Sequence, residues 1–573
     1  MNTNNNSNKR WQDINIREAI RFVHRMQVKI FEATMCSDTC KTNKLQIKLA
    51  NSFYAKVLAV KKVAKDNHGR KTAGIDGVKN LSEDEMFEMA STLTINHKPS
   101  PVRRKLIPKP GKKEKRPLGI PCMKDRAQQA LIALTLAPQW EARYSEQMFG
   151  FRKGRGAQDA LAYTRICLLN APRWILDADI ERFFDLLNHE ELLNRIDAPQ
   201  SIKDAIKRIL KAGHMAEKVI YRSEHGTPQG GPLSSILANI AMTRLIPYVE
   251  ARHRAQYQSK PPIIIIYADD MVVIHPDRDV IAHTKESIDS YLHQLGLRLS
   301  PSKTRICHTR DKDPDTKTRG FDFLGAHFQH VLTDDKKGGK RPYLLATPSR
   351  DDIKHIYKKC CQRIDRSIIN RKRQGKRRYN MSKGKRDPVT KMIRDLNLIL
   401  NGWSQYHSVI NAKETFSKVD NLIFNKLLKW SKRQFKSKTA DWRYQRMFSG
   451  IETDKDGNPL LRQDGEPRER NWAFKSPFVA NEKDHVTLIK IADRRVSTHT
   501  MTRLTSRYYD NDWLYWGSKQ NNYPGIPDTI YASALRRSGA KCSLCKSRFS
   551  KGDKVKEVTA KDTSLLVHCT CPH

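Results

Sequence analysis

The stretch IIIIYADDMVVIH, residues 263–275, sets two adjacent aspartates between two apolar runs rich in β-branched residues. Such runs favour strands, whereas aspartate is depleted in strands and a buried carboxylate without a partner is strongly disfavoured. We therefore predict a β-hairpin whose tip holds Asp269 and Asp270 against positive charge. Mg²⁺ fits this position, because it prefers hard oxygen ligands and is usually held by one or two carboxylates together with phosphate oxygens and water.

A second source of carboxylate lies upstream in LDADIERFFD, residues 176–185. Asp179 follows the apolar run that starts at Trp174, so it stands at the end of a predicted strand. For one Asp-Asp hairpin alone, an exposed turn is the simpler interpretation. Two acidic strand ends in one basic chain favour a shared metal site instead.

The charge balance points to a polyanionic partner. Among the 573 residues, 106 are lysine or arginine and 61 are acidic, which gives a formal net charge of +45. The mean hydropathy is −0.68 and the longest apolar run, residues 261–268, is far too short to span a bilayer. The start of the chain lacks the apolar segment of a secretory signal, and the 11 cysteines are scattered, so we expect a cytoplasmic protein without membrane contact.

The pattern of helices, strands and hairpins predicts an α+β domain followed by a helical module. VRRKLIPKPGKKEKRPLGIP, residues 102–121, predicts two strands joined by a Lys/Gly loop. The helix that begins at Met123 is predicted to stop near Pro138 or to continue as a second helix. In the helical module, apolar residues repeat on one face of each of two helices: Met392, Leu396, Ile399, Trp403 and Tyr406, then Val419, Ile423, Leu427 and Trp430.

Two basic segments of the helical module are predicted to contact phosphates. One is RKRQGKRR, residues 371–378, and the other lies in KWSKRQFKSK, residues 429–438. A solvated loop is the alternative for the first segment, but the charge of the whole chain favours nucleic acid. The candidate RNA-binding residues are Arg371, Lys372, Arg373, Lys376, Arg377, Arg378, Lys432 and Arg433.

Eight blocks in order resemble the reverse transcriptase blocks of group II intron-encoded proteins. They are TAGIDGV, IPKPGKKEKRPLGIP, FGFRKGRGAQDAL, DADIERFFD, GTPQGGPLSSILANI, YADD, LSPSKTR and FDFLGAHF. The segment GWSQYHSVINAKETFSKVDNLIFNKLLKWSKR, residues 402–433, is similar to the maturase or X (thumb) domain of that family. The resemblance covers roughly residues 10–450.

The resemblance implies a right-hand polymerase fold with fingers, palm and a helical thumb. Expected domains are a disordered tail (1–9), fingers and palm (10–335), thumb (336–450), a DNA-binding region (451–535) and a C-terminal tail (536–573). The DNA-binding region is assigned by position, with scattered basic and aromatic residues such as those of 493–516.

The resemblance also implies the roles of single residues. Asp179, Asp269 and Asp270 match the catalytic aspartates that hold two Mg²⁺ ions, with help from the main-chain carbonyl of Ile180. Lys303 falls where the family has a lysine that can protonate the departing pyrophosphate, although a plain surface lysine is an equal alternative. The implied nucleotide-binding residues are Lys109 and Arg116 at the triphosphate, Phe184 as a steric gate against the ribose 2′-hydroxyl, and Gln229 near the incoming nucleotide.

The implied function is that of an RNA-directed DNA polymerase and intron maturase. Its expected partners are group II intron RNA, a DNA target, an RNA template with a DNA primer, and deoxynucleotides, and its expected role is intron splicing and retrohoming. Two alternatives stay open: a maturase that only binds and folds RNA, and a host-adopted reverse transcriptase in phage defence. The sequence does not distinguish a monomer from a dimer.

The C-terminal tail contains CSLCKSRF, residues 542–549, which resembles the opening of the HNH endonuclease domain of this family. The His-His pair and later ligands of that domain are missing here. Cys542 and Cys545 could bind Zn²⁺ with two of His568, Cys569, Cys571 and His573, for which we take Cys569 and Cys571. We favour a truncated or degenerate remnant over a zinc site, and therefore expect no DNA endonuclease activity.

Overall fold

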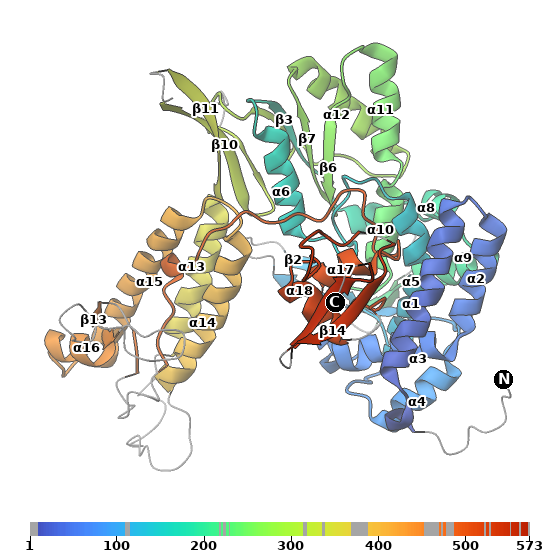
Figure 1. Ribbon diagram of the computed structural model, residues 1–573, viewed down its shortest axis with the longest axis horizontal. Coiled ribbons are helices and arrows are strands. Elements are labelled where there is room, and N and C mark those ends of the chain that lie inside the picture. Colours follow the sequence, from blue (N-terminus) through green and yellow to red (C-terminus); the bar gives the residue numbers. More distant parts are fainter. Residues whose placement is uncertain are drawn as a thin grey trace. The chain divides into compact units, whose positions relative to one another are not determined.

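The computed structural model describes residues 10–108, 115–216, 219–221, 225–227, 230–312, 318–334, 339–367, 388–451, 469–471, 474–476, 486–520, 523–526, 529–550, 552–560 and 563–570. The chain forms two compact units (Figure 1). Unit 1 comprises Met1–Ala160, Leu176–Ile306 and Thr502–His573, and unit 2 comprises Leu161–Ile175 and Cys307–Met501. These units do not end at the predicted boundaries 335, 450 and 535, because the chain after residue 501 packs with unit 1. The functional division into domains stays a prediction.

Unit 1 begins with a bundle of amphipathic helices. In α1, Ala19, Val23 and Ile30 are buried at helical spacing, and the Asn15 side chain caps the helix by accepting a hydrogen bond from the backbone N–H of Glu18. Helices α1, α2 and α3 pack on the long helix α5. The elements are η1 Trp11–Asp13, α1 Ile16–Met35, α2 Thr39–Asn51, α3 Phe53–Lys61, η2 Lys62–Asp66, η3 His68–Lys71, α4 Glu83–Thr92 and α5 Met123–Arg143.

Helix α5 corrects one prediction. It contains Pro138 in its interior, so the interruption that we expected at this residue does not occur. Proline removes one backbone hydrogen bond of a helix and typically destabilises it by about 3 kcal/mol. Here most of α5 is buried against its neighbours, and that packing offsets the loss.

A small sheet follows the bundle and has the strand order β2-β1-β4-β5. Strands β1 (Val102–Pro108) and β2 (Lys115–Ile120) are antiparallel, as the sequence predicted for this hairpin. Strand β4 (His214–Ala216) pairs in parallel with β1 and antiparallel with β5 (Val219–Tyr221).

A second sheet has the strand order β6-β7-β3-β8. Its strands are β3 Trp174–Asp179, β6 Ile263–Tyr267, β7 Asp270–His275 and β8 Arg305–His308. Helix α12 packs on β7 and on α11 (Figure 1). Helix α6 (Ala157–Leu168) precedes these strands, and the helices between them are α7 Phe183–Leu186, α8 His189–Arg195, α9 Gln200–Leu210, α10 Ser234–Met242, α11 Leu245–Gln256 and α12 Arg278–His293.

The C-terminal part of unit 1 packs on its N-terminal bundle. Tyr508, Tyr509, Trp516 and Tyr523 form one apolar cluster with Phe31 of α1. These aromatic side chains belong to the region that we predicted to bind DNA, yet they are core residues, so they are not available to stack on bases. The elements here are α17 Trp513–Lys519, α18 Thr529–Arg537, β14 Val555–Ala560 and β15 Thr563–His568.

Unit 2 combines a three-stranded antiparallel sheet, ordered β11-β10-β9, with a helical module. The predicted stripe of α15 is buried at all four positions, Val419, Ile423, Leu427 and Trp430. In α14, Met392 and Leu396 are buried and Trp403 is half-buried. The elements are β9 Phe321–Phe323, β10 Ala326–Asp334, β11 Lys340–Pro348, α13 Arg350–Asp365, α14 Pro388–His407, α15 Lys413–Gln434, α16 Ala440–Met447, β12 Ser449–Ile451, β13 Glu469–Asn471 and η5 Ile491–Asp493.

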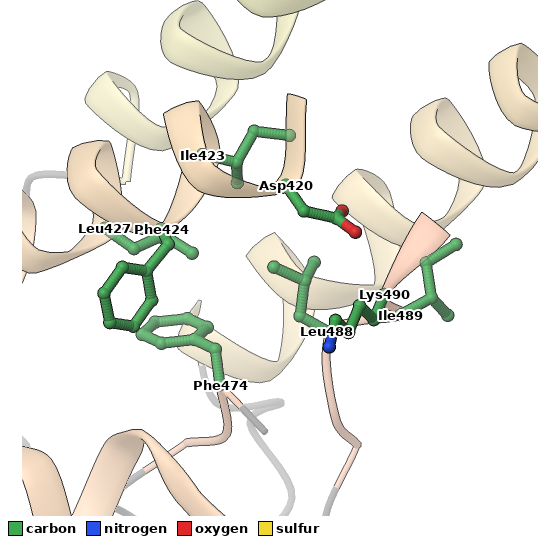
Figure 2. A pocket seen from close by; sticks show the side chains of 8 residues that line it. All are labelled: Asp420, Ile423, Phe424, Leu427, Phe474, Leu488, Ile489 and Lys490. Carbon is green, nitrogen blue, oxygen red and sulfur yellow. The ribbon is translucent and has the colours of Figure 1, made fainter. Parts of the chain in front are cut away.

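Helix α15 binds the later part of unit 2 through Asp420. The carboxylate of Asp420 accepts hydrogen bonds from the backbone N–H groups of Ile491, at 3.2 Å, and Ala492, at 2.8 Å. Beside it lies a cavity of about 20 Å³, lined by Phe424, Phe474 and other residues labelled in Figure 2. Because such a volume holds a single water molecule at most, this cavity is a packing feature and not a ligand site.

In the part of the chain that the structure describes, no helix combines the length and the apolar character needed to cross a membrane.

Candidate active site

The predicted hairpin is present, and its turn carries the two aspartates. Strands β6 and β7 are antiparallel, with Tyr267 opposite Asp270, so Ala268 and Asp269 form a two-residue turn. Ala268 has a φ of 58°, in the left-handed region that two-residue hairpin turns require. For a residue other than glycine this conformation is strained, and such strain is common at active sites.

The loop FGF, residues 149–151, holds this turn from one side. The backbone N–H of Phe149 donates to the carbonyl of Ile266 at 2.8 Å. A Cβ atom on Gly150 would lie only 2.3 Å from the backbone nitrogen of Ala268, so only glycine allows this approach. The Asn239 side chain of α10 donates to the Gly150 carbonyl at 2.9 Å and fixes the loop. Three of the sequence blocks therefore meet at the turn.

The second predicted carboxylate lies on the strand next to the hairpin. Asp179 is the last residue of β3, and β3 neighbours β7 in the sheet. The carbonyl of Asp179 accepts a hydrogen bond from Ser300 at 2.8 Å, and Ile180 pairs with Leu299. These bonds fix the end of β3 against the loop before β8.

Asp177 is a further carboxylate of the site that we did not predict. It stands two residues before Asp179, and side chains two apart on a strand point to the same face. Its carboxylate lies 3.2 Å from the Nε of Arg305 in β8. The alternation in LDAD was the signal that could have identified it.

Lys303 contacts the predicted catalytic carboxylate directly. Its Nζ donates to both carboxylate oxygens of Asp179 at 2.7 Å. The lysine side chain is 49% exposed, whereas that of Asp179 is 21% exposed. The pairing places a cation at the oxygens expected to bind metal, and the catalytic role of Lys303 stays a prediction.

The acidic groups of the site repel one another. Desolvation, followed by the negative charges of Asp269, Asp179 and Asp177, raises the pKa of Asp270 to about 7, and Lys303 opposes this rise only in part. An acid with a pKa near 7 marks a concentration of negative charge that a bound cation would relieve. Carboxylates are the hard oxygen donors that suit Mg²⁺, so the residues of this site fit the implied metal in their chemistry, while the part played by the Ile180 carbonyl stays a prediction.

Phe184 borders a cavity next to the β1-β2 hairpin. The cavity has a volume of about 170 Å³, and Arg104 and Arg182 also line it. Arg182 has a φ of 46°, which turns the chain sharply before α7. The backbone of Gly226 packs directly under Phe184, because a Cβ on Gly226 would lie 2.7 Å from the Phe184 carbonyl oxygen. The cavity thus combines an aromatic side chain with two arginines, of which Arg182 lies 3.6 Å from the carboxylate of Asp185.

The structure describes the remaining predicted nucleotide-binding and RNA-binding residues only in part. Lys109, Gln229 and residues 371–378 lie outside the described residues, and of Arg116 the structure gives only its backbone position in β2, opposite Ile107. Lys432 and Arg433 are exposed in the last turn of α15, where cations also complement the helix dipole. These assignments stay predictions.

In the C-terminal tail, the structure corrects one member of the candidate zinc set. The sulfur atoms of Cys542 and Cys545 and a ring nitrogen of His568 lie within 4.8 Å of one another. Cys569 follows the end of β15, is exposed and does not belong to this group. Cys571 lies outside the described residues.

Three family descriptions match successive parts of the chain. Residues 11–93 match the N-terminal domain of reverse transcriptase, and residues 107–328 match reverse transcriptase (RNA-dependent DNA polymerase). Residues 357–448 match the group II intron, maturase-specific domain. The second match contains every aspartate of the site, and the third contains most of helices α13 to α16.

Three curated proteins are similar to parts of this chain. Protein YkfC of Escherichia coli (strain K12) is 27% identical over 46% of this chain and 77% of its own length. The Group II intron-encoded protein LtrA of Lactococcus lactis subsp. cremoris is 34% identical over 32% of this chain, a match that spans only 31% of LtrA. Maturase-like protein 1 of Euglena gracilis is 25% identical over 68% of this chain and 76% of its own length.

Proposed function

The chain belongs to the group II intron-encoded reverse transcriptases and maturases, and on this premise we propose that it copies intron RNA into DNA by metal-assisted nucleotidyl transfer. The observation that carries the proposal is the group of Asp177, Asp179, Asp269 and Asp270, in which desolvation and then the neighbouring carboxylates raise the pKa of Asp270 to about 7. We propose that the product serves retrohoming of the intron to a DNA target.

The aspartates hold the metal in this proposal. Asp179 and Asp269 would be the principal ligands, with Asp270 and the carbonyl of Ile180 completing the oxygen donors. Two Mg²⁺ ions bound there would activate the primer 3′-hydroxyl and neutralise the triphosphate. The hairpin turn, held by Gly150 and Asn239, keeps Asp269 in a fixed position relative to β3, and such preorganisation lowers the cost of reaching the transition state.

Lys303 supplies a proton on the other side of the reaction. Its ammonium group already contacts Asp179, so it lies within reach of the groups that bind the triphosphate. As negative charge develops on the departing pyrophosphate, a lysine in this place can donate a proton to it. Its withdrawal from Asp179 would leave both oxygens of that carboxylate for metal.

Phe184 selects the sugar of the incoming nucleotide. In the proposal, the nucleotide enters the cavity that Phe184 shares with Arg104 and Arg182, whose guanidinium groups attract the triphosphate. The aromatic ring would then contact the ribose at C2′ and exclude a 2′-hydroxyl. Lys109, Arg116 and Gln229 are proposed as additional contacts of the incoming nucleotide.

The maturase role is proposed for unit 2. Its α15 presents Lys432 and Arg433 to solvent while Val419 and Trp430 form the core face, so one helix serves both packing and phosphate contact. Residues 371–378 would add further positive charge in the same module. Binding through phosphates predicts an affinity for intron RNA that falls steeply as salt increases.

Primer extension tests the polymerase. The full chain is given an RNA template, a DNA primer, deoxynucleotides and Mg²⁺, and is compared with the double substitution Asp269→Ala, Asp270→Ala. We expect the double variant to lose extension by at least about 10³-fold, because the metal contribution is worth several kcal/mol. Asp351→Ala is the matched control, since the Asp351 side chain is 86% exposed in unit 2.

The same preparations are tested for binding to group II intron RNA. Binding that survives in the double variant while extension is lost supports the proposal as stated. An intact protein that binds the RNA tightly but extends no primer would contradict it and leave the role of a maturase without polymerase activity.

A further inference from the structure

The C-terminal hairpin encloses a set of metal-binding atoms that takes no part in the polymerase site. The turn CSLC, residues 542–545, is closed by two backbone hydrogen bonds: Cys542 N–H to the carbonyl of Ser547 at 2.8 Å, and Lys546 N–H to the carbonyl of Cys542 at 3.0 Å. Lys546 has a φ of 61°, which reverses the chain directly after the second cysteine. The turn therefore presents both sulfur atoms on its inner side.

A histidine from the neighbouring strand meets these sulfurs. The Nδ1 of His568 lies 3.3 Å from the Sγ of Cys545, and the backbone N–H of His568 donates to the Sγ of Cys542 at 3.4 Å. Ligands of a tetrahedral Zn²⁺ ion, at about 2.3 Å for sulfur and about 2.0 Å for nitrogen, are separated by about 3.5 Å. The 3.3 Å between Nδ1 of His568 and Sγ of Cys545 is close to that separation.

Asp553 orients the histidine from the other side. Its carboxylate lies 3.1 Å from the Nε2 of His568 and accepts a hydrogen bond from the backbone N–H of Ser550 at 2.6 Å. When Nε2 donates its proton to a carboxylate, Nδ1 carries the lone pair and faces the sulfurs. Carboxylate, histidine and metal in this order are the usual arrangement around protein-bound zinc.

Among its described residues, the tail has a small apolar core. Its apolar core consists of a few residues around Leu535, Phe549 and Leu566, together with Leu514 of α17. Segments of about 40 residues rarely bury enough apolar surface to be stable, and disulfides or metals commonly supply the difference. Cys542 is itself fully buried in this core, so its sulfur joins the core to the proposed ligands.

We propose that Cys542, Cys545 and His568 bind one Zn²⁺ ion, that Asp553 orients His568, and that the ion fastens the β14-β15 hairpin to the turn at residues 542–545. The described residues provide three protein ligands, and solvent would take the fourth tetrahedral position. The site is independent of nucleotidyl transfer. It replaces our expectation that the tail is a remnant without metal.

Metal content of the purified full chain tests the site. We expect about one zinc per chain by elemental analysis, and Co²⁺ in its place should give the absorption of a tetrahedral site with thiolate ligands. Cys545→Ser and His568→Ala should each lose most of the metal, and Asp553→Asn should weaken zinc binding by about 10- to 100-fold. Cys569→Ser is the matched control and should keep the metal, because Cys569 lies next to His568 but outside the ligand group.

Primer extension by the same variants distinguishes loss of metal from loss of fold. Cys545 is exposed, so its substitution removes a ligand without opening a cavity in the core. A variant that extends primers normally but carries no zinc supports the proposal. Zinc retained by the Cys542→Ser, Cys545→Ser double variant, or an intact protein without zinc and with a Cys542–Cys545 disulfide, would overturn it.

Discussion

The ammonium nitrogen of Lys303 lies 2.7 Å from both carboxylate oxygens of Asp179, so the loop before β8 supplies a cation to the end of β3. In the metal-free protein this pair neutralises part of the charge that gathers around Asp270. If Asp179 binds Mg²⁺ as proposed, Mg²⁺ and Lys303 compete for the same two oxygens. Lys303 must therefore move away from Asp179 before both oxygens of that carboxylate can bind metal.

Replacing Lys303 by methionine is expected to lower the Mg²⁺ concentration for half-maximal primer extension. The pair is half-exposed and is therefore worth less than about 1 kcal/mol, which corresponds to a shift of about 2- to 5-fold. At saturating Mg²⁺ the rate should fall, because the proton donor is lost. Mg²⁺ titrations of kcat measure both effects, with Lys354→Met, at a 77% exposed side chain, as the control. Equal titration curves for Lys303→Met and the intact protein would contradict the competition.

Asp270 is expected to destabilise the metal-free protein at neutral and alkaline pH. Its pKa is raised to about 7 in the folded protein, chiefly by desolvation and by the neighbouring aspartates, against 3.8 as its ordinary value. Between these values the folded state binds the additional proton, so stability falls as pH rises from about 4 to about 7.

Asp270→Asn should therefore raise the Tm in EDTA at pH 8, and less so at pH 5. Thermal unfolding at the two pH values measures the difference, which should be small because Asp270 keeps contact with solvent. A gain in Tm that does not depend on pH would show that repulsion of the ionised carboxylate is not its cause.

Phe184→Ala is expected to relax the choice of sugar. Removing the ring opens the cavity where the 2′-hydroxyl would clash, so the ratio of kcat/KM for deoxynucleotides over ribonucleotides should fall by about 10- to 100-fold. Single-nucleotide incorporation measures it. Phe151→Ala is the control, since the Phe151 ring lies 6.4 Å from that of Phe184 and is exposed. If both variants discriminate as the intact protein does, Phe184 is not the gate.

Arg155→Ala is expected to release the segment that begins at Thr502. The Nη2 of Arg155 donates to the carbonyls of Leu504 at 2.5 Å and Ser506 at 3.2 Å, and the arginine is buried. Hydrogen bonds from a charged donor are worth about 1.5 to 3 kcal/mol, and the free energy of unfolding should fall by that amount. Urea unfolding gives the value, and hydrogen exchange should rise in residues 502–526.

Arg503→Ala is the matched control for this change, because the Arg503 side chain is exposed and lies over Tyr515 at 4.7 Å. An equal loss of stability in both variants would argue against a specific role for Arg155.

The sequence predicted the elements whose structure is set by residues close together in the chain. The YADD hairpin, the β1-β2 hairpin and the buried stripe of α15 all follow from the alternation or the helical spacing of apolar residues. The grouping of Asp179 with the hairpin was inferred from two acidic strand ends in one basic chain, and the resemblance to the family agreed with it. Pro138 was misjudged because burial on several sides outweighs a lost hydrogen bond.

Contacts between segments far apart in the chain could not be predicted from the spacing of apolar residues. The aromatic residues Tyr508, Tyr509 and Trp516 looked like part of a nucleic-acid surface, since composition cannot tell a buried aromatic from a stacking platform. Likewise, the sequence could not identify the proposed zinc ligands among the cysteines and histidines of the tail. Which of them come together depends on the face of β15 that packs against the turn at residues 542–545.

The hydrogen bonds of Arg155 to Leu504 and Ser506 join residues that are 349 and 351 positions apart in the chain. This separation sets a delay during synthesis before the two partners can meet. At a synthesis rate of roughly 5 to 20 residues per second, about 20 to 70 seconds pass between the emergence of the two partners. During that interval the nascent chain displays the apolar face of α1 around Phe31 without its tyrosines and tryptophan. Unit 1 is thus completed last although its first helices are made first, and this apolar surface stays uncovered until residues 508–523 have been synthesised.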